Sequence, residues 1–122
     1  MGLKSFLPYG LLLALLMSFP LRVLAQSGGW WVVRAPMPSS RTEVAVVEVG
    51  GKLYVIGGES PSGTLHQNES YDPATNSWTA WAPMPTARHG LGAAVVGKSI
   101  YVLSGGPQPG GTYSSANEVF TP

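Results

Sequence analysis

The stretch VGGKLYVIGG at residues 49–58 decides the fold, because it returns as VGKSIYVLSGG at residues 96–106 with one residue of slack. Other features repeat at nearly the same spacing, about 47 residues from Pro36 to Pro83. APMPSSR at 35–41 returns as APMPTAR at 82–88, and ESYDP at 69–73 returns as EVFTP at 118–122. Trp31 lies five residues before Pro36, and Trp78 lies five residues before Pro83. Separate features at one spacing indicate two copies of one structural unit.

Each copy predicts short antiparallel strands. Apolar and β-branched residues fill 43–49 and 52–56 on either side of a glycine pair, and 89–96 and 99–103 repeat that hairpin. A third strand is expected to end at Tyr71, and after a turn at 72–76 a fourth begins at Trp78. The continuous apolar runs at 44–47 and 93–96 favour strands covered on both faces. We therefore expect an all-β fold of four-stranded antiparallel blades stacked as in a β-propeller.

The pattern resembles the kelch repeat, in which a glycine pair follows an apolar strand and a tyrosine precedes a tryptophan by seven positions. This resemblance implies a blade one at 42–82, an incomplete blade two at 89–122, and a segment 30–35 that completes a blade of mixed origin. It assigns structural roles to Gly57, Gly58, Tyr71, Trp78, Gly105, Gly106, Phe120 and Trp31.

Two blades are fewer than the roughly four to eight with which propellers close. The chain is therefore expected to be a partial propeller, or one completed by oligomerisation. Two interpretations stay open: the sequence is a piece of a longer propeller, or copies assemble head to tail, about three chains giving six blades.

The first 25 residues predict a signal peptide. Lys4 precedes an apolar segment at 7–19, and Val23 and Ala25 occupy the −3 and −1 positions of a cleavage site before Gln26. The apolar segment is shorter than the roughly 20 residues of a membrane span. We expect a secreted or periplasmic protein, cleaved after Ala25, whose mature region 26–122 has no stable membrane span. The alternative is an uncleaved N-terminal anchor.

The composition of the chain narrows the kinds of ligand and cofactor that it is expected to bind. Charged residues make up 11% of the chain, the formal net charge is +1, and there is no cysteine. The basic residues form no cluster, so nucleic-acid binding is not expected. His66 and Glu69 lack a third ligand nearby in sequence, so neither a metal nor a cofactor is expected.

The connections between second and third strands, 59–64 and 107–115, are expected on one face, the usual place for binding in repeat proteins. The ligand-contact candidates are Glu59, Arg88, His89 and Tyr113. For Arg88, which repeats Arg41, a structural role between blades is favoured. No catalytic residue is predicted.

These features favour an exported, non-catalytic module that recognises a protein or a glycan through these loops. The alternative is a fragment of a secreted propeller enzyme acting on sugars, because the resemblance extends to N-acetylneuraminate epimerases and galactose oxidase-like copper enzymes. The copper enzymes use a tyrosine cross-linked to cysteine, which this sequence lacks. An epimerase-like sugar site has only Arg88 and His89 in its favour. A third interpretation is purely architectural, two blades lent to a larger assembly.

Overall fold

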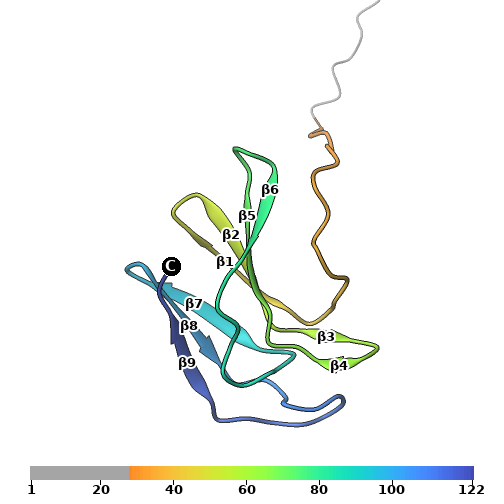
Figure 1. The fold of residues 1–122 in the computed structure, drawn as a ribbon, viewed down its shortest axis with the longest axis vertical. Coiled ribbons are helices and arrows are strands. Elements are labelled where there is room, and N and C mark those ends of the chain that lie inside the picture. The colour runs from red at the N-terminus through yellow and green to blue at the C-terminus, as the bar shows by residue number, and fades with distance from the viewer. Residues whose placement is uncertain (1–27) are drawn as a thin grey trace, which may run out of the picture. The chain divides into compact units, whose positions relative to one another are not determined.

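The repeated sequence folds as two antiparallel β-sheets that pack against each other (Figure 1). The structure, a computed structural model, describes residues 28–122, so the predicted signal peptide lies outside the described residues. Residues 32–122 form one compact unit, to which the described residues 28–31 do not belong. Every regular element between residues 28 and 122 is a strand, which confirms the all-β prediction. No helix in this range could span a membrane.

Blade one is a four-stranded sheet and blade two a three-stranded one. Blade one has the order β1-β2-β5-β6, with strands β1 (Ala45–Val49), β2 (Lys52–Ile56), β5 (Asn68–Asp72) and β6 (Ser77–Ala80). Blade two has the order β7-β8-β9, with strands β7 (Gly92–Val96), β8 (Ser99–Leu103) and β9 (Asn117–Phe120). All neighbours pair antiparallel. A two-stranded hairpin of β3 (Glu59–Ser60) and β4 (Gly63–Thr64) lies between β2 and β5.

The core lies between the two blades. Because side chains alternate along a strand, one face of blade one presents Ala45, Tyr54 and Ile56 to blade two, where Ile100 and Val102 meet them. All five side chains are buried. The continuous apolar runs predict cover on both faces of each sheet. Within residues 32–122 the other face of blade one is covered only in part, since Val55 on it is buried and Val46 is exposed, and Val96 on the other face of blade two is exposed.

Three aromatic rings close the outer part of this interface. Trp81, which follows β6, packs between Tyr54 and Phe120 with ring centroids 6.2 and 5.9 Å away. Its indole Nε1 donates a 2.9 Å hydrogen bond to Ser70 Oγ. Trp81 is therefore a packing residue of the blade interface, although it stands outside the repeat pattern of the sequence.

Arg88 joins the two blades and is completely buried. Its guanidinium forms a 2.8 Å ion pair with Glu118 and donates hydrogen bonds of 2.6 and 3.2 Å to the carbonyls of Ser104 and Ala116 in blade two. Its backbone bonds to blade one, where the amide of Gly58 donates to the Arg88 carbonyl at 2.9 Å. Arg88 is thus removed from the ligand-contact candidates, because a fully buried, saturated guanidinium does not reach a ligand.

Arg41 repeats this arrangement in blade one. Its buried side chain forms a 2.8 Å ion pair with Glu69 and donates to the Val55 carbonyl at 3.2 Å. The repeated arginine of the APMP motif therefore has a structural role in both copies.

Gly57 sits where the chain leaves β2 with a φ of 65°, in the left-handed region. A Cβ atom placed on it would lie 2.6 Å from the carbonyl oxygen of Arg88 and 2.6 Å from Leu91 Cδ2. Both the backbone conformation and the missing side chain are needed here.

Blade two makes the equivalent turn with a different residue type at its first position. β8 corresponds to β2 residue by residue, without an insertion. Ser104, with a φ of 60°, is therefore the equivalent of Gly57, and Gly105 is the equivalent of Gly58. The stretch therefore contains no extra residue, and Gly106 lies outside the glycine pair, at the place of Glu59, because Gly106 pairs with His89 as Glu59 pairs with Thr42.

The segment before β1 lies against the outer strands of blade one without pairing as a strand. Arg34 donates hydrogen bonds to the Tyr71 hydroxyl at 3.0 Å and to the Pro73 carbonyl at 2.7 Å. The Ala35 amide donates to Asn76 Oδ1 at 2.9 Å, and Trp78 Nε1 donates to the Ala35 carbonyl at 3.0 Å. The blade-completing strand predicted at 30–35 is not formed within this chain, and the side chain of Trp31 is fully exposed.

Candidate functional site

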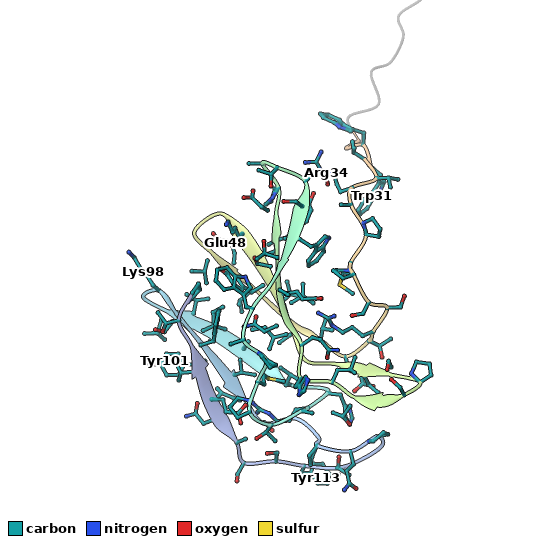
Figure 2. The ribbon with its side chains drawn as sticks, in the orientation of Figure 1. Trp31, Arg34, Glu48, Lys98, Tyr101 and Tyr113 are labelled. Carbon is teal, nitrogen blue, oxygen red and sulfur yellow. The ribbon has the colours of Figure 1, made fainter. Side chains whose placement is uncertain are left out.

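The connections between second and third strands gather at one end of the two sheets. Since β2 and β8 both start at a tight turn and run toward these connections, the turns near Glu48 and Lys98 lie at the opposite end from Tyr113 (Figure 2). The first connection is not irregular, as the sequence indicated, but contains the β3–β4 hairpin. We call residues 59–64 and 104–116, together with Glu43 and His89, the loop face.

His89 is the centre of the loop face. Its Nδ1 lies 2.7 Å from Glu43 Oε2 and 3.6 Å from Glu59 Oε2, and its Nε2 lies 2.9 Å from the carbonyl oxygen of Gln108. Carboxylate and carbonyl oxygens only accept hydrogen bonds, so both ring nitrogens are satisfied at once when both carry a proton. The hydrogen bond to Glu43, and then that to Gln108, raise the pKa of His89 above its ordinary value of 6.5.

Backbone pairing holds these side chains in place. Thr42 and Glu59 exchange two amide–carbonyl hydrogen bonds of 2.9 Å, which fix the start of the hairpin. His89 and Gly106 exchange bonds of 3.0 and 2.9 Å, which fix the start of the second connection. The imidazole therefore braces two loops that belong to different blades.

Glu43 is the residue of this site that the sequence did not single out. Its φ is 54°, uncommon for a non-glycine residue, and the repeat places Gly90, with a φ of 59°, at the equivalent position. A glutamate where the other copy has a glycine is the signal that could have identified it. The strained backbone is retained where the carboxylate meets His89, which lies 46 positions away along the chain.

Of the four ligand-contact candidates, the structure brings Glu59 and His89 together and leaves Tyr113 apart. The hydroxyl of Thr112 donates to the Gln108 carbonyl at 2.6 Å and closes the tip of the second connection. Tyr113 follows this closure and is almost completely exposed, at 91% (Figure 2). It is the exposed aromatic side chain of the loop face.

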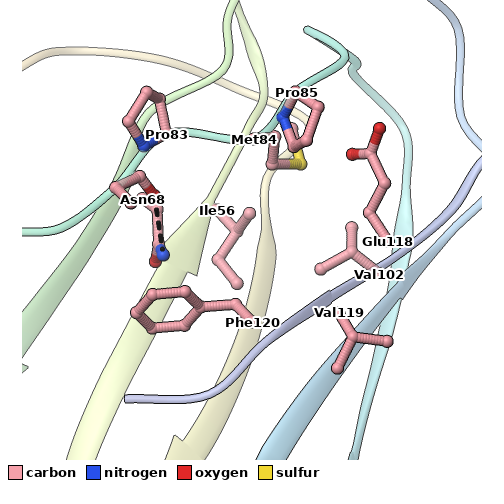
Figure 3. Close-up of a pocket in the computed structure, with 10 residues that line it drawn as sticks. Ile56, Asn68, Pro83, Met84, Pro85, Val102, Glu118, Val119 and Phe120 are labelled. Carbon is pink, nitrogen blue, oxygen red and sulfur yellow. Dashed lines mark hydrogen bonds between the residues drawn. The ribbon is translucent and has the colours of Figure 1, made fainter.

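Two hollows lie in this part of the chain. An open one of about 380 Å³ lies beside the hairpin and is lined by Ser40, Arg41, Thr42, Glu59, Ser60 and Pro61. A smaller one of about 200 Å³ lies between the blades; its lining is mostly apolar, with Ile56, Met84, Val102 and Phe120, and also includes Asn68 and Glu118 (Figure 3). Within residues 28–122 no group of three or more histidine, aspartate or glutamate side chains could hold a metal ion.

The brace around His89 predicts a pH-dependent stability. Because the folded-state pKa is raised, the contribution of protonated His89 is complete below about pH 6.5 and is lost as pH rises through the folded-state value. Urea unfolding between pH 6 and 9 should therefore show stability falling with pH, and Glu43→Gln should flatten that slope. Glu48→Gln, at the opposite end, is the control and should keep the slope; an unchanged slope in Glu43→Gln would contradict the brace.

Comparison with known proteins agrees with this architecture. The kelch motif model matches residues 40–85. The solved structure titled "Structure of YjhT" is similar with a TM-score of 0.57 and 26% sequence identity, and the match covers 62% of this chain. The same match covers 24% of the YjhT chain, so the similarity spans about a quarter of that protein's length. No curated protein matches the sequence.

Proposed function

Because this chain is a kelch-repeat protein with a propeller-type fold, we propose that it is an exported interaction module that binds a protein or a glycan through the loop face. Kelch repeats support a protein-interaction role at the coarse level. The export, the choice of ligand class and the contact residues are parts of the proposal.

One observation carries it. Connections from two blades are braced at His89; one connection presents an exposed Tyr113, and the other borders a hollow that includes Glu59. A braced backbone whose loops display an exposed aromatic ring and hydroxyl and carboxylate groups on one face is a typical binding surface. Tyrosine serves both ligand classes, because its ring stacks on sugars or apolar side chains and its hydroxyl forms hydrogen bonds.

The arrangement offers less support for a sugar-modifying enzyme. An epimerase-like site would use Arg88 and His89, but Arg88 is buried and both nitrogens of His89 face acceptor oxygens within 2.9 Å. A protonated imidazole bound on both sides does not accept a proton from a substrate.

The test is binding of the full chain to a glycan array and to a displayed peptide library. For any ligand selected, Tyr113→Ala and Glu59→Ala should each weaken binding about tenfold or more, as truncation of a central contact does. Lys98→Ala and Glu48→Gln, at the opposite end of the sheets, should leave the affinity unchanged. A folded chain that binds nothing in either screen, or equal losses in both sets of variants, would contradict the proposal.

A further inference from the structure

The second connection of the loop face contains a turn that one hydrogen bond attaches to the rest of the molecule. We call residues 107–113 the distal turn. Its residues are exposed, apart from the partly buried Thr112. Within residues 28–122 the one hydrogen bond that joins the distal turn to another part of the chain is the 2.9 Å contact between His89 Nε2 and the Gln108 carbonyl oxygen. Neither burial nor other hydrogen bonds therefore fix the turn in place.

The distal turn is closed by hydrogen bonds of its own. The Thr112 hydroxyl donates to the Gln108 carbonyl at 2.6 Å, and the Gln108 amide donates to the Thr112 hydroxyl at 3.2 Å. The Thr112 amide donates to the Gly110 carbonyl at 2.8 Å. These bonds do not involve His89. Loss of the contact with His89 therefore leaves the turn closed but frees it to move about its two ends.

The charged groups that face the imidazole of His89 are both acidic. Its Nδ1 lies 2.7 Å from Glu43 Oε2, in the segment before β1, and 3.6 Å from Glu59 Oε2, in β3. The distal turn has no charged side chain, and the guanidinium of the neighbouring Arg88 is paired with Glu118. The two carboxylates favour the doubly protonated ring, and the hydrogen bond to Glu43 is the largest cause that raises the pKa of His89.

The neutral imidazole has one proton too few for both of its neighbours. It donates on one side only, and the proton stays at Nδ1, because a hydrogen bond to a carboxylate is roughly twice as strong as one to a neutral carbonyl. Nε2 then presents a lone pair to the Gln108 carbonyl oxygen, and two acceptors 2.9 Å apart repel each other. Loss of one proton therefore breaks the contact on the side of the distal turn.

Both ends of the second connection are held without the imidazole. The backbone of His89 exchanges hydrogen bonds of 3.0 and 2.9 Å with Gly106, before the distal turn. Arg88 donates to the Ala116 carbonyl at 3.2 Å, after the turn, and the Ser104 amide donates to the same carbonyl at 3.0 Å. The blade interface therefore stays packed when the turn between these anchors is freed.

We propose that His89 controls the distal turn through one proton: the doubly protonated imidazole holds the turn beside the blade interface, and the neutral imidazole releases it while the two blades stay together. Tyr113, the last residue of the turn, is positioned in the doubly protonated form (Figure 2). Blade one lacks this device, since Thr42 stands at the place of His89 and the β3–β4 hairpin forms the connection. The consequence for ligand binding rests on the proposed function, whereas release of the turn does not.

Nuclear magnetic resonance of the full chain between about pH 6 and 9 tests the release without a ligand. The imidazole shifts of His89 give its titration midpoint, and carbon relaxation of the Gly110 and Gly111 Cα groups gives the mobility of the turn. We expect their order parameters to fall from about 0.85 to below about 0.6 as pH rises through the midpoint. The Cα group of Gly97, at the opposite end of the sheets, should not change with pH.

Three glutamine variants test whether the proton acts through His89. Glu43→Gln keeps an acceptor beside Nδ1 but removes the charge, so the midpoint of His89 and the release of the turn should both move to lower pH. Glu59→Gln should move both by less, because its carboxylate lies 3.6 Å away. Glu48→Gln, at the opposite end, should move neither.

The outcomes separate this inference from the proposed function. The affinity of a ligand selected for the loop face should fall about tenfold across the same midpoint, as expected for Tyr113→Ala. Release of the turn with an unchanged affinity supports the inference and counts against Tyr113 as a ligand contact. Order parameters that do not follow the midpoint of His89, or a release that stays at the same pH in Glu43→Gln, overturn the inference whatever the ligand does.

Discussion

Arg88→Ala will lower the free energy of unfolding by about 3–5 kcal/mol, the usual result of removing one partner from a buried ion pair. The variant leaves the Glu118 carboxylate at the interface without its 2.8 Å partner, and it removes the donor from the carbonyls of Ser104 and Ala116. Because the side chain is completely buried, water does not replace these bonds without opening the blade interface. Urea denaturation at constant pH measures the change.

Arg34→Ala is the matched control for this experiment. Arg34 also donates hydrogen bonds, to the Tyr71 hydroxyl and the Pro73 carbonyl, but it is exposed. Its removal should cost about 1 kcal/mol, the net value of ordinary hydrogen bonds. A loss below about 1 kcal/mol for Arg88→Ala would show that Arg88 does not hold the two blades together.

The second large effect is expected at Gly57. Alanine there must adopt a φ near 65°, which costs about 1–2 kcal/mol, and its Cβ meets the Arg88 carbonyl at 2.6 Å, which adds about 1–3 kcal/mol of overpacking. We expect Gly57→Ala to lose about 2–5 kcal/mol in total, measured by the same denaturation.

Gly97→Ala separates these two causes. Gly97 has nearly the same φ, 62°, but nothing lies within 4 Å of a Cβ placed on it. The control should therefore lose only the conformational part, about 1–2 kcal/mol. Equal losses at the two positions would mean that the close approach of the Arg88 backbone is unimportant.

The repeat makes the strands predictable, because two copies of one pattern show which positions are equivalent. The expected strands at 52–56 and 99–103 coincide with β2 and β8. Local turn chemistry is less informative: Ser104 adopts the left-handed conformation of Gly57, and a side-chain pattern does not reveal such a residue. The alignment of the glycine pair was therefore one residue off.

The site is harder to predict for a different reason. Glu43 and His89 meet only when two blades stack, and neither belongs to a strand. The repeat shows which positions of the two copies are equivalent. The contact, however, joins Glu43 and His89, whose equivalents in the other copy are Gly90 and Thr42, so the repeat does not reveal it. The packing of Trp81 is hard to predict for the same reason, since its neighbours Tyr54 and Phe120 come from both blades.

Arg88 also determines where this chain can be divided. Its backbone amide donates to the Leu65 carbonyl and its own carbonyl accepts from Gly58, while its side chain is embedded beside Glu118. A cut at the border between the sequence repeats would separate these anchors, so neither half keeps its full set of bonds. The cooperative folding unit is therefore offset from the sequence repeat, and the two blades should melt in a single transition.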